Sequence, residues 1–339
     1  MGKFVCMQQK HTKSQCCQGS IYQHGQRRRQ CSLCKRTWRI RQKKRGRKLR
    51  RINTDIVKRF LKNGSFNIFE HAQRLNIGIS ALQERIRKSR DLFLSKEEWP
   101  KIPGSCKLIT VVDALIEKID KQYYTVYFVA LRSTKSEKAV ILEPIIFPRY
   151  ENKKDWQRVF KRIPRETRNR ILALVGDGKP CFITITREYG WLFQRCHFHL
   201  LAELHRWASF KRRSKNRKLA EKLNGLVRNI ITTKNEKQLK TSLNETAKLV
   251  RDPHVPIRIK QRFLKGFYRN FEFYRTYLNH SELNLPKTVN SCEKLCGFVR
   301  KFLNKTNGLR TAKSFSKWTK TLMLHQKKIN CRGTNFPPR

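Results

Sequence analysis

The chain has 339 residues, which is enough for two or three domains and a sizeable hydrophobic core. It carries 78 Lys and Arg residues against 24 Asp and Glu residues, so its formal net charge is +54. Such a charge repels itself unless a polyanion neutralises it, so we expect nucleic acid as the partner. We expect no membrane, since no apolar stretch approaches the roughly 18 residues of a spanning helix.

The cysteine usage indicates a reducing compartment. Eleven cysteines, an odd number, are scattered over a long basic chain, which suits a few metal ligands better than a disulfide framework. The first residues also lack the apolar segment of a secretory signal. We therefore expect a protein of the cytoplasm that associates with the nucleoid.

Residues 1–40 are predicted to form a zinc-ribbon-like module. Cys31 and Cys34 have the Cys-x2-Cys spacing of a zinc knuckle, and a tetrahedral zinc site replaces the core that so small a module cannot build. A regular first knuckle ending at Cys17 needs a cysteine at position 14, where the chain has a serine. An incomplete site is therefore the alternative. The predicted ligands of the structural Zn²⁺ are Cys16, Cys17, Cys31 and Cys34, with Cys6 or His11 open as substitutes for Cys16.

Residues 41–53 are predicted to be a basic linker that lies on phosphates. The stretch from Arg39 to Arg51, RIRQKKRGRKLRR, has no apolar periodicity. Arg45 and Arg47 flank a glycine, and this triplet suits an AT-rich minor groove. Plain phosphate contact is the alternative for both arginines.

Residues 54–98 are predicted to hold three short helices in a helix-turn-helix arrangement. Asn67 with Glu70 and Ser80 with Gln83 match capping boxes, and each would open a helix. The expected inward residues of the second and third helices are Phe69, Ala72, Leu75, Leu82 and Ile86. The expected DNA-contacting residues of the third helix are Gln83, Arg85, Arg87 and Lys88. A plain helical hairpin is the alternative.

Residues 105–200 are predicted to be an α/β layer fold, because strand-like and helical periods alternate there. We expect each of two acids, Asp113 and Asp177, to follow the end of a strand; Asp177 lies between two glycines after the apolar run at 171–175. The expected strands are 107–113, 123–131, 139–147 and 171–175, with a helix at 152–163.

Residues 201–285 read as a very basic helical segment, for which the sequence predicts phosphate contact at most. Residues 286–330 return to two amphipathic helices. In the first of them, Glu293 lies off the apolar stripe. The stripe expected to be buried is Leu295, Phe298, Val299 and Phe302, followed by Phe315, Trp318, Leu322 and Met323 in the final helix.

Asp113, Asp177 and Glu293 are the candidate catalytic residues. Phosphoryl transfer in DNA without a protein nucleophile uses two divalent cations roughly 4 Å apart, and Mg²⁺ or Mn²⁺ takes carboxylate oxygens. These three acids are therefore the predicted ligands of two Mg²⁺ (or Mn²⁺) ions per active site. A plain cap is the alternative role for Glu293. Other acids in this part of the chain that stay open as alternatives are Glu117, Asp120, Glu188 and Glu203.

Several residues resemble the prokaryotic relatives of the Mutator-type transposases, which are insertion-sequence enzymes with an Asp-Asp-Glu triad. The resemblance runs from Asp113 to the carboxyl terminus. It implies an RNase H-like catalytic core with an all-helical insertion between the second Asp and the Glu, and it assigns the metal to the three acids. The residues that carry it are the Asp-Gly at Asp177, then Gln194, Arg195, Cys196 and His199, and later Pro286, Thr288, Asn290, Glu293 and the turn at Asn307.

Cys196 and His199 match the Cys/His pair of that family. From the residues alone, the pair could be a nucleophile with its base, half of a zinc site, or a structural or substrate-positioning pair, which is the expected role. The whole chain is expected to be a transposase that binds the element's terminal repeats, cleaves double-stranded DNA and joins it to a target, as a homodimer or larger on DNA. The alternatives are a non-catalytic, domesticated DNA-binding regulator and an RNA-binding or ribosome-associated protein.

Overall fold

The computed structural model describes residues 20–24, 28–39, 54–63, 68–209, 217–306 and 309–331. The chain divides into two compact units, Met1–Ile52 and Asn53–Arg339. Among the helices described, none combines the length and the apolar character that crossing a membrane requires.

The first unit contains a small antiparallel sheet of β1 (Ile21–Gln23), β2 (Arg28–Cys31) and β3 (Thr37–Arg39). Cys31 is buried at the end of β2, and the exposed Cys34 lies in the turn that follows. The backbone N–H of Lys35 donates to the Cys31 carbonyl at 3.1 Å, and Lys35 has a φ of 59°. The predicted residues of this unit that lie outside the described residues are Cys6, His11, Cys16, Cys17, Arg45 and Arg47.

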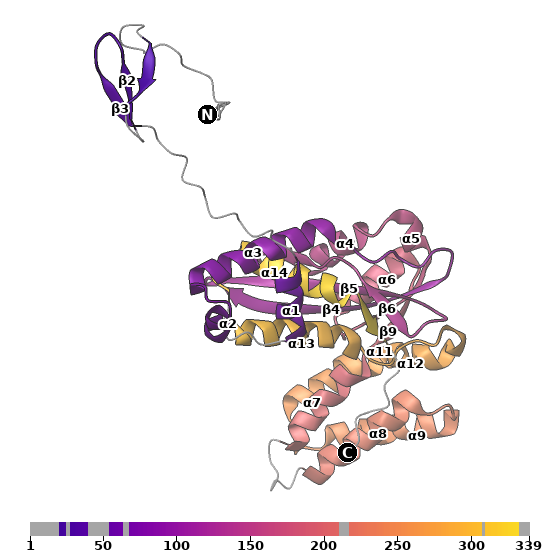
Figure 1. Cartoon of the computed structure of the whole chain (residues 1–339). Coiled ribbons are helices and arrows are strands. Elements are labelled where there is room, and N and C mark those ends of the chain that lie inside the picture. Colours follow the sequence, from indigo (N-terminus) through magenta and orange to yellow (C-terminus); the bar gives the residue numbers. More distant parts are fainter. Residues whose placement is uncertain are drawn as a thin grey trace. The chain divides into compact units, whose positions relative to one another are not determined.

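The second unit is built on a central, mostly antiparallel sheet with parallel edge strands (Figure 1). The strand order is β10-β6-β5-β4-β8-β9, and β7 pairs with β5. β8 runs parallel to β4, and β9 runs parallel to β8. The strands are β4 (Leu108–Ile119), β5 (Gln122–Ser133), β6 (Lys138–Ile141), β7 (Ile145–Phe147), β8 (Ile171–Gly176), β9 (Leu192–Arg195) and β10 (Lys328–Asn330). The α/β class that the sequence predicts is confirmed.

Two of the predicted strands have other bounds. The first strand does not end at Asp113, because residues 113–119 continue in antiparallel pairing with β5, with Asp113 opposite Phe128. The strand expected at 139–147 is two strands, β6 and β7, which pair with different parts of β5. They are separated at Pro144, which has no N–H for a ladder bond.

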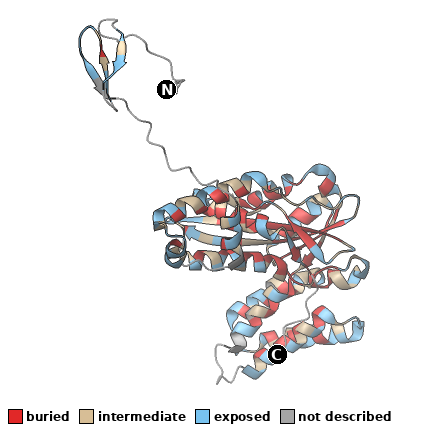
Figure 2. Cartoon of the chain, in the orientation of Figure 1, coloured by how far each residue is buried: buried red, intermediate tan, exposed pale blue. Residues whose placement is uncertain are grey.

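Helices cover both faces of the sheet. On one face, α13 (Asn290–Lys305) and α14 (Ala312–Gln326) pack on a core that includes Val111 and Val175. On the other face lie α4 (Lys153–Lys161) and α6 (Pro180–Tyr189), with α5 (Arg165–Asn169) leading into β8. Figure 2 shows the buried residues gathered in the strands and on the inner sides of these helices.

The three predicted amino-terminal helices are present, with partly different details. They are α1 (Asp55–Asn63), α2 (Ile68–Arg74) and α3 (Ile79–Lys96). The predicted burial of Ala72, Leu82 and Ile86 is confirmed. The inward placement of Phe69 and Leu75 is wrong, since their exposed fractions are 66% and 42%. Ser80 is not a cap either, because α3 begins at Ile79 with Gly78 before it. Asn67, the other expected cap, lies outside the described residues.

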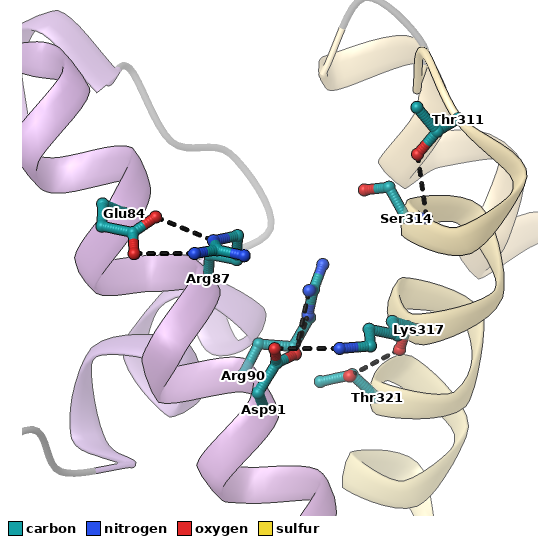
Figure 3. A network of polar contacts seen from close by, with 8 residues as sticks. All are labelled: Glu84, Arg87, Arg90, Asp91, Thr311, Ser314, Lys317 and Thr321. Atoms are coloured by element: carbon teal, nitrogen blue, oxygen red, sulfur yellow. Dashed lines mark hydrogen bonds and ion pairs between the residues drawn. The ribbon is translucent and has the colours of Figure 1, made fainter.

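These helices pack against α14 and form part of the same unit as the sheet. The ring of Trp318 lies 5.1 Å from that of Phe60, and the Arg90 guanidinium lies over it at 5.2 Å. Figure 3 shows the polar contacts across the interface, where Lys317 Nζ reaches Asp91 Oδ2 at 2.9 Å. The position of α3 is therefore fixed relative to the sheet.

The segment between β9 and α13 is helical, as predicted, and has its own apolar core, which includes Leu204, Val227 and Phe263. Its last long helix, α12, returns to the sheet, where the N–H of Tyr277 donates to Gln194 Oε1 at 2.9 Å. The elements are α7 (His197–Ser209), α8 (Arg217–Thr232), α9 (Glu236–Arg251), α10 (Ile257–Gln261), the π-helix η1 (Arg262–Phe267), α11 (Tyr268–Asn270), α12 (Glu272–Asn279) and the 3-10 helix η2 (Ser281–Leu283).

Candidate active site

Asp113 and Asp177 are brought together by the pairing of two parallel strands. Val111 of β4 is in register with Val175 of β8, and each acid lies two residues further along its strand direction. Side chains alternate along a strand, so both acids follow the inward residues Val111 and Val175. Those two valines belong to the core beneath α13. The two aspartates therefore lie on the sheet face that α13 covers.

A β-bulge sets this register. Leu108 pairs with Ile171, but the next residue, Ile109, pairs with Ala173, so Leu172 is an extra residue in β8. Beyond this extra residue the pairing is regular, and the pair Val111–Val175 puts Asp177 in line with Asp113. β-Bulges are common next to active sites.

Among the described residues, the hydrogen-bond donors to Asp113 are a backbone N–H and a thiol, neither of them a cation. Asp113 Oδ1 accepts from the Ala114 N–H at 2.9 Å, and Asp113 Oδ2 accepts from the Cys296 thiol at 3.5 Å. Burial, followed by the charge of Asp177, raises the pKa of Asp113 to about 6. Asp113 is thus destabilised as an anion, which is the state that a divalent cation would stabilise.

Asp177 lies in the loop between β8 and α6 and has a lysine beside it. Its Oδ1 accepts from the Lys179 N–H at 3.1 Å, and the Lys179 ammonium lies 3.4 Å from its Oδ2. The same ammonium contacts Glu151, a nearly buried acid that also accepts from the Trp156 indole at 2.7 Å. Lys179 therefore links a structural acid to a candidate ligand.

Glu293 approaches the pair of aspartates from the first turn of α13. Burial, followed by the charge of Asp113, raises the pKa of Glu293 to about 7, while Arg300 opposes the shift. Its Oε1 lies 3.3 Å from Nε2 of His199. Asp113 on β4 is thus within the range of two other charges, that of Asp177 at the end of β8 and that of Glu293 on α13.

The donor set suits a hard divalent cation, because it consists of carboxylate oxygens that repel one another. Within the described part of the chain, however, no three His, Cys, Asp or Glu side chains are already placed around a common metal position. The carboxylate of Glu293 is turned to His199. An ion held by all three acids therefore requires Glu293 to take another rotamer.

Cys196 and His199 both hold α13 in place. The Cys196 sulfur accepts from the N–H of Val289, just before α13, at 3.3 Å, and burial raises the pKa of the thiol to about 12. A thiol in that state is no nucleophile at neutral pH. Burial likewise lowers the pKa of His199, whose Nε2 lies 3.3 Å from Glu293 Oε1. Of the possible roles, the contacts favour positioning.

The alternative acids are placed elsewhere. Asp120 lies in the tight turn between β4 and β5, with a φ of 48°. Glu117 faces Arg300 at 3.4 Å, and Glu188 pairs with Lys153 at 3.2 Å. Glu203 lies in α7, and its side chain is outside the described residues. None of the three described acids joins Asp113 and Asp177.

The predicted DNA-contacting residues lie on the outer side of α3. Gln83, Arg87 and Lys88 are exposed, and Arg85 is half-buried. Arg87 and Lys88 both pair with Glu84, at 2.7 and 3.3 Å. This acid has to release its cations before they can bind phosphates.

Three residues beside the acids were not singled out from the sequence. Lys179 is two positions from Asp177, so the same motif could have indicated it. Cys296 and Arg262 lie in helices far along the chain, and only the fold brings them close. Arg262 belongs to the helical segment, for which the sequence predicted phosphate contact at most, and its Nη2 lies 3.5 Å from the His199 carbonyl.

Comparison with known proteins does not identify the chain. No protein-family model matches it, and no curated protein matches it.

Proposed function

We propose that this protein is a metal-dependent DNA transposase whose catalytic acids are Asp113, Asp177 and Glu293. The observation that carries the proposal is the gathering of two of these acids around Asp113, although the three are 64 to 180 positions apart in the chain. The pairing of β4 with β8 puts Asp177 in line with Asp113, and Glu293 on α13 lies within the range of the charge of Asp113. In a chain with 78 basic residues, three clustered acids favour a cation site beside a polyanion.

The sheet supports an RNase H-like core. Three antiparallel strands, β6, β5 and β4, are followed in space by the parallel strands β8 and β9. The first acid lies on the central strand and the second at the end of its parallel neighbour. The third comes from a helix on the same face, after a helical insertion. An RNase H-like core with a split Asp-Asp-Glu triad has this order.

The three carboxylates would hold Mg²⁺ or Mn²⁺, which supplies an activated oxygen nucleophile and stabilises the leaving oxygen. The chain's own residues position these groups. Cys196 fixes the start of α13, His199 holds Glu293, and Lys179 places a positive charge beside Asp177 for the substrate phosphate.

Recognition of the element's ends is assigned to the amino-terminal parts. α3 would offer Gln83, Arg85, Arg87 and Lys88 to DNA. Cys31 and Cys34 suit two ligands of a structural Zn²⁺, because a left-handed residue follows the second cysteine in a tight turn. The remaining predicted ligands, Cys16 and Cys17, and the groove arginines, Arg45 and Arg47, belong to the same proposal. Joining two ends calls for at least a dimer on DNA.

The test uses a supercoiled plasmid that carries the coding region with its flanking DNA. Wild-type protein with Mg²⁺ or Mn²⁺ is expected to cut it at the flanks, and EDTA is expected to abolish the cutting. Asp113→Asn, Asp177→Asn and Glu293→Gln should each lower the cutting rate by more than about 100-fold, since even the loss of an outer partner of a metal ligand costs 10–100-fold.

A matched control is Glu188→Gln, which removes an acid that pairs with Lys153 outside the cluster. It should cut like the wild type. All four variants should bind the flanking DNA as the wild type does. Binding without any cutting by the wild type would support the non-catalytic regulator instead, and cutting that survives Asp177→Asn would refute the assignment of the acids.

A further inference from the structure

A cavity of about 370 Å³ opens beside the acidic cluster. Asp177 forms part of its wall, and the opposite wall comes from the helical segment between β9 and α13. The cavity is thus enclosed by the β8–α6 loop, the start of α7, η1 and α12. Its lining residues include Asp177, Lys179, Arg195, Arg262, Phe267 and Tyr274.

The charge of this cavity is positive. Lys179, Arg195 and Arg262 face it, and Asp177 is the one acid among the described residues that line it. Lys179 pairs with Asp177 at 3.4 Å and also contacts Glu151. Three cations thus face the cavity against one lining acid, and this excess of positive charge favours an anion.

Arg195 is held in a fixed orientation. Its Nη2 donates to the Gly178 carbonyl at 2.5 Å, and its guanidinium lies over the Tyr274 ring at 4.9 Å. Its Nε is buried and has no hydrogen-bond partner. A buried donor without a partner costs free energy, so this N–H is a candidate for a bond to a ligand.

Arg262 lies close to Arg195 although both are cations. Burial and then the charge of Arg195 lower the pKa of Arg262, and its Nη2 is 3.5 Å from the His199 carbonyl. Arg262 begins the π-helix η1. Such turns are rare and are frequently found at functional sites. The turn brings Arg262, Gly266 and Phe267 to the same wall.

The rest of the wall consists of His199, two glycines and larger apolar or aromatic residues. The last group is Pro180, Leu200, Phe267 and Tyr274. A volume of about 370 Å³ is at the small end of the range for ligand sites. The cations suit a phosphate, and the apolar and aromatic side chains suit a sugar and base.

We propose that this cavity binds one nucleotide of a DNA strand, with its phosphodiester held by Arg195 and Arg262, next to the phosphate that the acidic cluster acts on. The position of the cleaved bond rests on the proposed function, whereas the binding of the nucleotide does not. The geometry that supports it is the shared wall residue, Asp177, which belongs to both the cavity and the cluster.

The test is hydrogen-exchange mass spectrometry of the full chain in EDTA, with the 5′-phosphorylated thymidine dinucleotide as the probe. We expect slower exchange in residues 195–200 and 262–274. Arg262→Gln should weaken the apparent affinity by more than about tenfold, because a charged hydrogen bond contributes roughly 1.5–3 kcal/mol. Arg195→Gln should weaken the affinity in the same way. If Arg195→Gln does not fold, the result for Arg262→Gln alone tests the proposal.

Arg258→Gln is the matched control. It removes an equal charge one helical turn earlier, from an exposed side chain of α10, and should keep the protection. The proposal is overturned if neither segment is protected, if Arg262→Gln leaves protection unchanged, or if inorganic phosphate at the same concentration protects as strongly. Protection without plasmid cutting would refute the proposed transposase activity and support the nucleotide site. Plasmid cutting without protection would support the transposase activity and refute the nucleotide site.

Discussion

Asp113 and Asp155 show how differently two carboxylates are treated in the same protein. Asp155 is fully buried, but Arg149 donates to it at 2.8 and 2.5 Å and Asn152 donates at 2.6 Å. Burial alone would raise the pKa of Asp155, and these partners lower it instead. Asp113 has a second acid in place of such partners, so its pKa rises. A structural role explains the first carboxylate and not the second.

The Asp155 contacts predict a dependence of stability on pH. A carboxylate whose pKa is lower in the folded state stabilises the fold above its unfolded pKa, near 3.9, and this contribution is lost as the pH falls through the folded value. Because Arg149 is 48% exposed and water screens its charge, Asp155→Asn should cost only about 1–2 kcal/mol at pH 7.

Urea unfolding at pH 7 and at pH 3 measures this difference. The gap between wild type and Asp155→Asn should shrink at the lower pH. Glu166→Gln, which changes an exposed acid of α5, should differ little from the wild type at either pH. An equal gap at both pH values would contradict the electrostatic explanation.

At the residue scale, the sequence predicted the three acids because each follows a readable local pattern: two lie after apolar runs, and one begins an amphipathic helix. It did not predict Cys296, Lys179 or Arg262. A thiol that donates to Asp113 from a distant helix has no local pattern, since the contact depends on how α13 lies on β4.

Among the elements, α1–α3 depend on α14. The buried residues Phe60, Leu82 and Phe93 belong to one apolar cluster with Trp318 and Leu324. Each large apolar side chain of this kind contributes roughly 1.5–3 kcal/mol when it is removed from water. The helices therefore complete the core unit rather than stand beside it.

This dependence predicts two outcomes of truncation. A chain that begins at residue 53 should fold and unfold cooperatively, because the division between the compact units falls there. A chain that begins at residue 99 should aggregate or melt at a lower temperature, because Trp318 loses its cover. Circular dichroism melting and gel filtration distinguish the two. A stable monomer beginning at residue 99 would show that α1–α3 are independent.

The predicted buried face of α13 was partly wrong. Phe298 was expected inside with Leu295 and Val299, but it is 42% exposed. The buried face of α13 instead includes Cys292 and Cys296, small side chains that lie close to the sheet. Periodicity finds the stripe, whereas its exact rotation is decided by the neighbouring strand.

For the whole molecule, the net charge of +54 predicts DNA affinity that depends steeply on salt. Each phosphate that the protein neutralises releases bound counterions, so six to ten contacts should cost about 10³–10⁵ in affinity between 50 and 200 mM salt. Filter binding or fluorescence polarisation across this range measures the slope. A flat response would exclude a large phosphate-contacting surface.

The class of the fold could be predicted at this scale, since strands and helices alternate in the sequence. The packing of α1–α3 into the same unit as the sheet could not be predicted, because Trp318 and Phe60 are far apart in the chain and no local pattern relates them.

The extra residue in β8 bears on which changes of length this strand accepts. Leu172 is the one position between Ile171 and Val175 that has no partner in β4, so a chain without it would pair Ile171 and Ala173 with Leu108 and Ile109 in an unbroken ladder. Asp113 and Asp177 would then stay on one face. β8 can therefore lose this leucine without parting its acid from that of β4.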